Sequence, residues 1–416
     1  MNIDLMRKVD YFAGVPLCAL VTPFVWLASL FSKQKLIKPR KVLFIELSEM
    51  GSAILVDPAM RKMQIAANAE LFFVIFKSNA ASLRLLNTVP VNNVFTIREN
   101  NMLNLATDSV RFLAWTRKNN IDTVIDLELF SRYSALLTGL CGAAKRVGFH
   151  AFYNEGLYRG AMLTHRVAYN PTLHIAKNFI ALVNAALSNK QEIPYSKTII
   201  DDNEIKLARA PVVESVINDM RGRIREAFSN YDESRHRIVL INPNASDLLP
   251  QRRWMPEHFV TVMRDLLEKS DDILVLITGA PAEHEQAENL KKQVAHARCI
   301  NFAGKQKLEE LPALYQMAEL MLTNDSGPGH FSSVTDLRTF VLFGPETPLL
   351  YGSLGNSTPI YAGLACSPCV SAANHRKTPC NDNVCLQAIK PETVLTQLRD
   401  ALAHKALVNT LPKNIG

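Results

Sequence analysis

The stretch "LTNDSGPGHFSSV" at residues 322–334 ends an apolar run in Asn-Asp-Ser-Gly-Pro-Gly-His. The apolar residues predict a buried strand, and a helix is expected to begin near Pro328. Free N–H groups at such a junction attract phosphate, and Gly327 and Gly329 would let a ligand approach the backbone closely. The stretch therefore predicts a parallel α/β fold with a site for a phosphorylated ligand.

The same residues allow two other interpretations. Asp325 or Ser326 could serve only as the cap of the helix. Ser326 and His330 could instead be the nucleophile and base of a hydrolase. A hydrolase nucleophile elbow needs Gly-x-Ser-x-Gly, and the residue two before Ser326 is Asn324. The pattern disfavours the hydrolase and leaves the helix cap and the phosphate site open.

The alternation of strands and helices extends outward from this stretch into two halves of the chain. Strands are predicted at 41–47, 71–76, 93–97 and 121–127, and again at 237–243, 272–280, 320–324 and 339–345. Helical patterns separate them, which indicates parallel βαβ units. We predict an N-terminal segment 1–40, a Rossmann-like domain 41–190, a helical connection 191–235, a second Rossmann-like domain 236–390, and a terminal helix and tail 391–416. Ligands of such domains bind beyond the carboxyl ends of the strands.

The N-terminal segment is unusually apolar. Residues 11–31 carry no charge, and 21 residues can span a bilayer. Gly14, Pro16 and Pro23 interrupt the run, which also suits a helix that lies in the membrane interface. A basic cluster follows at Lys33, Lys35, Lys38, Arg40 and Lys41. We predict peripheral or anchored attachment to an anionic membrane surface through residues 11–31, with the globular part on the cytoplasmic side. A signal peptide and a helix buried against the protein stay open as alternatives.

Overall charge gives a weaker indication. The formal net charge of +7 and the pI of about 9.0 suit an anionic partner, but they suit an ordinary soluble enzyme nearly as well. Nucleic acid is not a predicted partner, because the chain lacks interleaved aromatic residues or a known nucleic-acid-binding module.

Four of the seven cysteines lie close together in sequence, at Cys366, Cys369, Cys380 and Cys385. Their spacing is near that of a zinc site, and His375 lies among them. Structural zinc, reduced thiols and disulfides are all compatible with this pattern. The other cysteines are scattered singly, which favours a reducing compartment.

Two further strand ends carry polar residues. In "INPNASDLLPQRRWMPEHF" (241–259), Arg252 and Arg253 could clamp a diphosphate, or they could belong to a solvated loop. In "ITGAPAEHEQAENL" (277–290), Gly279 ends a strand and Glu283 and Glu285 follow in the first turn of a helix. These carboxylates could favour the helix dipole or could bind ribose or base.

Taken in order, "NPNAS", "RRWMPEHF", "TGAPAEHE", "LTNDSGPGHF" and "VLFGPETPLLYG" resemble the C-terminal half of glycosyltransferase family 9. These are the heptosyltransferases that build the lipopolysaccharide inner core from ADP-heptose. The similarity runs over residues 237–389, and a looser one covers 41–60. It implies an α/β GT-B fold, in which two facing Rossmann-like doubly wound domains hold the active site in their cleft.

The resemblance also implies an activity. It would be an inverting transfer of heptose from a nucleotide-diphospho-sugar, ADP-heptose, to a lipid-linked glycan acceptor in lipopolysaccharide core biosynthesis. The enzyme would act at the cytoplasmic face of the inner membrane without a metal or other cofactor. No Asp-x-Asp motif for a Mg²⁺-bound diphosphate occurs in the chain. A transferase using another nucleotide-sugar and a non-catalytic nucleotide-sugar-binding assembly protein stay open as alternatives.

Residue by residue, the resemblance assigns the donor site. Arg252 would stabilise the leaving diphosphate. The donor-binding residues would be Asn244, Ser246, Arg253, Gly279, Glu283, Asp325, Ser326, Gly327 and His330. Asn244 replaces the glycine that the family usually has after this proline.

The catalytic base departs from the family pattern. Family heptosyltransferases carry Gly-Asp at the first strand–helix turn, and that aspartate is the expected base. Here the pair is Gly51-Ser52, and a serine does not take up a proton at neutral pH without help. Glu49 is the nearest carboxylate, with Glu46 and Asp57 further away. The sequence favours the hypothesis that Glu49 is the base, and the alternative is that it is an exposed turn residue.

Overall fold

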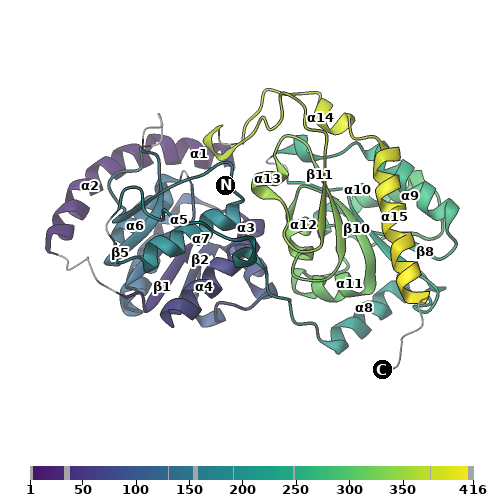
Figure 1. Cartoon of the computed structure of the whole chain (residues 1–416), viewed down its shortest axis with the longest axis horizontal. Helices are drawn as coiled ribbons and strands as arrows, with labels where there is room; N and C mark the ends of the chain where they lie inside the picture. The colour runs from purple at the N-terminus through teal and green to yellow at the C-terminus, as the bar shows by residue number, and fades with distance from the viewer. Residues whose placement is uncertain are drawn as a thin grey trace. The chain divides into compact units, whose positions relative to one another are not determined.

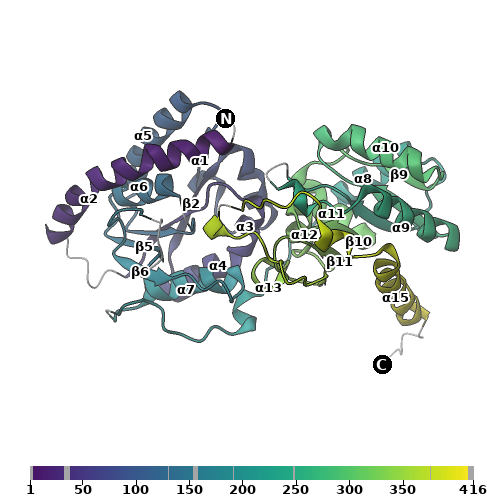
Figure 2. The same ribbon diagram turned by 90° about the horizontal axis from the view of Figure 1, so that it is seen from above.

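The structure is a computed structural model that describes residues 3–31, 38–129, 131–152, 158–190, 192–246, 249–374 and 376–410. The chain divides into two compact units, Met1–Ala208 and Arg209–Gly416, so that the predicted connection 191–235 is split between them. Each unit contains a six-stranded parallel sheet flanked by helices (Figures 1 and 2). The α/β prediction with two doubly wound domains is confirmed.

The sheet of the first unit has the strand order β3-β2-β1-β4-β5-β6, which is the order of a dinucleotide-binding Rossmann sheet. Its strands are β1 Lys41–Ile45, β2 Glu70–Phe76, β3 Val94–Ile97, β4 Thr123–Asp126, β5 Lys145–His150 and β6 His165–Ala168. β1 lies between β2 and β4, and Ile45 at its end pairs with Asp126 at the end of β4. The order reverses at β1 and β4, so a crevice is expected beyond their carboxyl ends.

The sheet of the second unit repeats this order as β12-β11-β10-β7-β8-β9. Its strands are β7 Arg237–Asn242, β8 Ile273–Ile277, β9 Cys299–Asn301, β10 Ala318–Asn324, β11 Arg338–Phe343 and β12 Ser357–Tyr361. β7 and β10 are adjacent and take the places that β1 and β4 hold in the first sheet. The quoted stretch at 322–334 therefore lies at the point where the strand order reverses.

The helices cover both sheets. In the first unit they are α1 Ile3–Phe12, α2 Gly14–Phe31, α3 Met50–Leu55, α4 Asp57–Ala67, α5 Met102–Lys118, α6 Arg132–Leu140 and α7 Ile175–Leu187. In the second they are α8 Glu214–Ala227, α9 Pro256–Lys269, α10 His284–Val294, α11 Leu311–Met317, α12 Gly327–Ser332, α13 Pro348–Tyr351, α14 Val384–Gln387 and α15 Pro391–Thr410. α7 is largely buried, because its apolar residues pack against β5 and α4.

The predicted apolar segment 11–31 lies mostly in α2, and α1 before it carries charged residues. α1 and α2 meet at Ala13, and both contact α6 on the first unit (Figures 1 and 2). No single helix in the described ranges is long and apolar enough to cross a membrane. Leu5–Phe12 and Gly14–Ala28, bent by 40°, pass that test of length and composition only together. Lys33 and Lys35 of the predicted basic cluster lie outside the described residues.

Candidate active site

Asn324, the last residue of β10, connects three loops at the carboxyl edge of the second sheet. Its side chain is fully buried. Its Oδ1 accepts a hydrogen bond from the Trp254 N–H at 3.0 Å, and its Nδ2 donates to the Pro243 carbonyl at 2.7 Å. The loop after β7, the Arg252–Trp254 segment and the start of the Asp325 loop are thereby held together. The sequence analysis did not identify this role of Asn324.

Arg252 faces two buried carboxylates beyond this junction. Its Nη1 lies 3.7 Å from Asp325 Oδ2 and 3.6 Å from Glu346 Oε2. Glu346 follows β11 and is also paired with Arg376, whose Nε lies 3.3 Å from Glu346 Oε1. Arg376 in turn stacks over the Tyr351 ring at 5.1 Å. The structure thus adds Glu346 and Arg376 to the predicted Arg252 and Asp325, and it makes the solvated-loop interpretation of Arg252 wrong.

The environment of Asp325 favours its protonated form. Burial, together with the neighbouring Glu346 carboxylate, raises the pKa of Asp325 to about 8, although Arg252 acts in the opposite direction. Two carboxylates this close cannot both ionise at low cost in a buried site. Asp325 therefore keeps its proton at neutral pH and leaves more of the charge of Arg252 available to an anionic ligand.

Ser326 precedes α12 at the N-cap position, but its side chain makes no capping hydrogen bond. Its Oγ donates instead to the Asn324 carbonyl at 3.1 Å. Gly327 begins α12, and a Cβ atom there would come within 3.0 Å of the Phe331 ring. His330 is mostly buried in the same short helix. The Ser326 side chain therefore does not cap the helix. Its hydroxyl lies at the turn where the sequence predicts a phosphate site.

Three more predicted donor residues meet at the end of β8. A Cβ atom on Gly279 would lie 2.8 Å from Asn244 Nδ2 and 2.7 Å from Glu283 Oε2, so a larger residue here would displace these two polar groups. Glu283 Oε2 accepts a hydrogen bond from the Ala280 N–H at 2.6 Å. Asn244 Nδ2 lies 3.4 Å from the Thr278 carbonyl. Glu283 thus has a local structural role in the turn before α10, which was the alternative to ligand binding. Its position next to Asn244 also suits contact with a ligand.

The remaining predicted donor residues are less central. Arg253 donates from Nε and Nη2 to the Ala245 carbonyl, at 3.0 and 2.7 Å, and so supports the loop after β7. Ser246 is exposed on that loop. Arg252, Asp325, Asn244, Gly279 and Glu283 form the compact part of the site.

The first sheet presents a different set of groups at its carboxyl edge. Ser52 is buried in α3, and its Oγ donates to Glu49 Oε2 at 3.1 Å. Glu128, which the sequence analysis missed, follows β4 and reaches the loop after β1. Its Oε1 accepts from the Leu47 N–H at 2.9 Å, from the Ser48 N–H at 3.3 Å and from Ser48 Oγ at 3.2 Å.

The ionisation of Glu128 is strongly perturbed. Burial raises its pKa to about 7, and the charges of Asp126 and Glu49 act in the same direction. The hydrogen bonds from Leu47 and Ser48 oppose the shift without cancelling it. A carboxyl group with a pKa near neutrality suits general acid–base catalysis.

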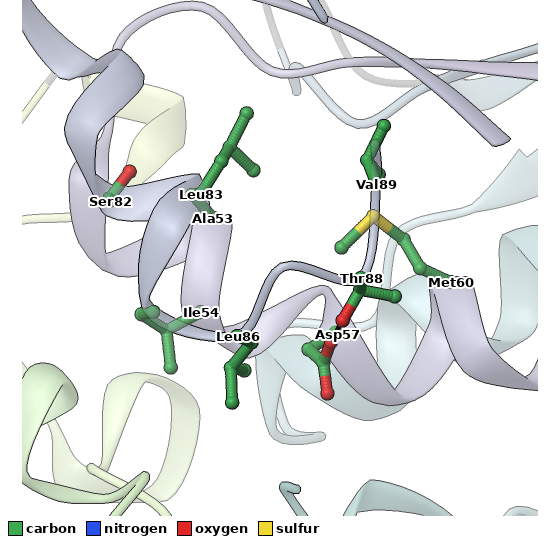
Figure 3. A pocket seen from close by; sticks show the side chains of 9 residues that line it. All are labelled: Ala53, Ile54, Asp57, Met60, Ser82, Leu83, Leu86, Thr88 and Val89. Atoms are coloured by element: carbon green, nitrogen blue, oxygen red, sulfur yellow. Dashed lines mark hydrogen bonds between the residues drawn. The ribbon is translucent and has the colours of Figure 1, made fainter. Parts of the chain in front are cut away.

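Other carboxylates near this edge are enclosed. Asp57 is fully buried, accepts a hydrogen bond from Arg61 Nε at 2.7 Å and is hydrogen-bonded to Thr88. Figure 3 shows Asp57 and Thr88 next to each other in the pocket between α4 and the segment after β2. Asp126 is fully buried and paired with Arg159. Glu46 is also buried. Glu49 and Glu128 are the two carboxylates of this group that are partly exposed.

The four clustered cysteines do not form a metal site. They are free thiols, and no group of three or more His, Cys, Asp or Glu residues in the described ranges could hold a metal ion. His375 lies outside those ranges. The structure therefore does not support structural zinc, one of the three states that the spacing of Cys366, Cys369, Cys380 and Cys385 left open.

Comparison with known proteins agrees with this geometry. The family model described as glycosyltransferase family 9 (heptosyltransferase) matches residues 111–378, which is more than half of the chain. The chain belongs to glycosyltransferase family 9. The match includes Glu128 as well as the whole set of donor residues, and it confirms the family that the sequence motifs resemble.

Curated relatives of this family 9 enzyme are distant. Lipooligosaccharide heptosyltransferase 2 of Campylobacter jejuni is 28% identical over 176 residues, covering 41% of this chain and 53% of the relative. Lipopolysaccharide heptosyltransferase 2 of Escherichia coli is 24% identical over 220 residues, covering 52% of this chain and 58% of the relative. The chain thus spans about half the length of the curated relatives it matches.

Solved structures of similar proteins cover more of this chain than the curated relatives do. The E. coli ADP-heptose lipopolysaccharide heptosyltransferase II structure superposes with a TM-score of 0.67 at 18% identity, covering 88% of this chain and 99% of that chain. A family 9 glycosyltransferase from Veillonella parvula gives the same TM-score and identity and covers 90% and 99%. These similarities confirm the GT-B-like fold.

Proposed function

We propose that this enzyme transfers heptose from ADP-heptose to a lipid-linked glycan acceptor in lipopolysaccharide core biosynthesis. Family membership supports a nucleotide-sugar transferase, and the names of the relatives support heptose and a lipopolysaccharide or lipooligosaccharide acceptor. The observation that carries the proposal is the Arg252–Asp325–Asn324 junction, where a cation and a glycine-containing turn meet beyond the ends of β7 and β10.

The donor would bind at the second sheet. Arg252, with Asp325 kept neutral beside it, would stabilise negative charge on the diphosphate as the bond to the sugar breaks. Ser326 and the backbone at Gly327 would contact the phosphates, and Glu283 with Asn244 would contact the nucleoside. A carboxylate of the first unit would take the proton of the acceptor hydroxyl. The acceptor oxygen would attack the anomeric carbon opposite the diphosphate, which leaves with its electron pair, so the configuration inverts.

Calorimetry with ADP, UDP and GDP, followed by a transfer assay with ADP-heptose, tests the proposal. We expect selective ADP binding and metal-independent transfer. Binding and turnover with another nucleotide-sugar would replace the donor. ADP binding without any turnover would favour a non-catalytic assembly protein, the alternative that Ser52 at the expected aspartate position keeps open.

We further propose that α1 and α2 lie flat on the membrane surface. One side of α2 is docked on the protein, where Cys18 and Val25 pack with Ala135 and Met162. The opposite side exposes four apolar residues at helical spacing, Leu17, Leu20, Phe24 and Leu27, which are 46–67% exposed. A helix held along one side by protein is suited to partial insertion, with the exposed Lys8 and Lys38 near anionic lipid headgroups.

Flotation with vesicles tests this orientation. We expect the protein to float with vesicles containing anionic lipid, and the double variant Leu20→Glu/Phe24→Glu to remain in the dense fraction with an unchanged thermal midpoint. Ile199→Glu is the matched control, because Ile199 is 98% exposed, belongs to the same unit and lies outside α1 and α2. Unchanged flotation of the double variant would contradict the proposed surface.

A further inference from the structure

We propose that Glu128 is the catalytic base of the transfer reaction. It would take the role of the aspartate that the family carries at the position held here by Ser52. This inference rests on the proposed function, since it names the group that accepts the proton of the acceptor hydroxyl. It differs from the hypothesis from sequence, which placed that role on Glu49.

The position of Glu128 in the sheet is the first argument. β4 lies directly beside β1, and the Leu127 N–H donates to the Ile45 carbonyl at 3.0 Å, so the chain leaves β4 next to the loop after β1. This is the point at which the strand order reverses, where ligands of doubly wound sheets bind. In the second sheet the residue at the matching strand end is Asp325, which lies in the donor site. Glu128 and Asp325 therefore hold corresponding places in the two units.

The geometry of the carboxylate is the second argument. All the hydrogen bonds that Glu128 accepts from the described residues end on Oε1, which is fixed by Leu47 and Ser48. Oε2 has no hydrogen bond to those residues, and the side chain is partly exposed. One oxygen thus orients the group while the other is left for a substrate hydroxyl, as a general base requires.

The electrostatic surroundings are the third argument. The charged groups that face Glu128 are Asp126 from its own strand and Glu49 from the loop after β1, with Arg159 paired to Asp126 beneath them. Together with burial, the two carboxylates raise the pKa of Glu128 to about 7. About half of such groups are ionised at neutral pH, and the ionised form is a stronger proton acceptor than an ordinary surface carboxylate.

Glu49 is better suited to raising the pKa of Glu128 than to acting as the base itself. Its Oε2 already accepts a hydrogen bond from Ser52 Oγ at 3.1 Å. Its negative charge raises the proton affinity of Glu128. In the reaction, Glu128 takes the hydroxyl proton, the acceptor oxygen bonds to the anomeric carbon, and the bond to the diphosphate oxygen breaks. Glu128 then returns the proton to water.

The test compares Glu128→Gln with Glu49→Gln in the full-length enzyme. Glutamine keeps a carbonyl oxygen for the Leu47 and Ser48 hydrogen bonds, so the loop stays in place while the base is lost. We expect the kcat of Glu128→Gln to fall by about 10²–10⁴-fold, the usual contribution of a general base, and that of Glu49→Gln to fall by less than about tenfold. The affinity for ADP should stay unchanged in both, because the donor residues are in the second unit.

The pH profile separates catalysis from a structural effect. For the wild type, kcat/KM should rise with pH to a plateau with a midpoint near 7, and Glu128→Asp should retain this rise at a lower plateau. A Glu128→Gln enzyme with near wild-type kcat, or a larger loss in Glu49→Gln, would overturn the inference. If Glu128→Gln does not fold, the Glu128→Asp profile decides instead, and loss of its pH-dependent rise would overturn the inference. A wild type that binds no ADP and transfers no sugar would remove the proposed function.

Discussion

Replacing Asn324 by alanine is expected to destabilise the second unit and to weaken ADP binding together. The side chain of Asn324 is fully buried and bonds to the Trp254 N–H at 3.0 Å and the Pro243 carbonyl at 2.7 Å. Alanine leaves this buried donor and this buried acceptor without partners. Each such group costs about 1–3 kcal/mol, so the free energy of unfolding should fall by about 2–6 kcal/mol.

Urea unfolding followed by tryptophan fluorescence measures this loss. Trp254 is the only tryptophan in residues 209–416, so a Trp26→Phe/Trp115→Phe background makes the signal specific for the second unit. Asn356→Ala is the matched control, because Asn356 is exposed and donates one bond, to the Asp336 carbonyl at 3.1 Å. If Asn324→Ala costs no more than this control, Asn324 does not connect the loops as we argue.

Three further predictions concern the donor site and the thiols. Because the pKa of Asp325 is raised, its contribution to stability is complete at acidic pH and is lost as pH rises through about 8. The thermal midpoint of the wild type should therefore fall relative to that of Asp325→Asn between pH 5 and 8.5. A difference between the two midpoints that does not change with pH would contradict the raised pKa. Arg252→Ala should weaken ADP binding about 10–100-fold by calorimetry, the value of one or two hydrogen bonds to a charged group, and an unchanged affinity would place the diphosphate elsewhere. Incubation with EDTA should leave turnover and the thermal midpoint unchanged, since the cysteines at 366–385 form no metal-binding group in the described ranges; loss of either would restore the zinc hypothesis.

Most central elements of the fold could be predicted from sequence because their patterns are local. The runs at β1, β2, β7, β8 and β10 are short, apolar and bounded by turn residues, as buried parallel strands are. Among the helices expected between the strands, α9 begins with Pro256, a residue that is favoured at the first position of a helix. These segments carry enough information within about ten residues to specify their own structure.

The missed strands carry patterns that are typical of other structures. β5 reads "KRVGFH", yet Lys145 and Arg146 are buried and donate to backbone carbonyls of Ala186 and Met162, each at 2.7 Å. β9 is only three residues long. β12 contains Pro359 and lies at the edge of its sheet, where proline is tolerated. Their strand character comes from tertiary contacts, which the local sequence does not display.

The candidate site was only half predictable for a similar reason. Asp325, Ser326 and Gly327 are consecutive, and a motif reveals them. Glu128 lies 81 residues from Leu47 along the chain, and only the pairing of β4 with β1 brings them together. Glu346 reaches Arg252 in the same way, because β11 pairs with β10. Parallel sheets collect the ends of distant strands, so a site built there needs the strand order as well as the motifs.

The hydrogen bonds of Asp10 have a practical consequence for anyone who prepares this enzyme. Asp10 in α1 accepts bonds from the N–H groups of Arg132 and Tyr133, each at 2.9 Å, at the start of α6. α6 follows the segment that carries Glu128 out of β4. Deleting α1 and α2 to improve yield would therefore remove the Asp10 hydrogen bonds to the first turn of α6 and expose the surface around Ala135. Keeping the N-terminus intact is the better preparation, because activity lost after trimming would reflect damage to the first unit as well as loss of the proposed membrane attachment.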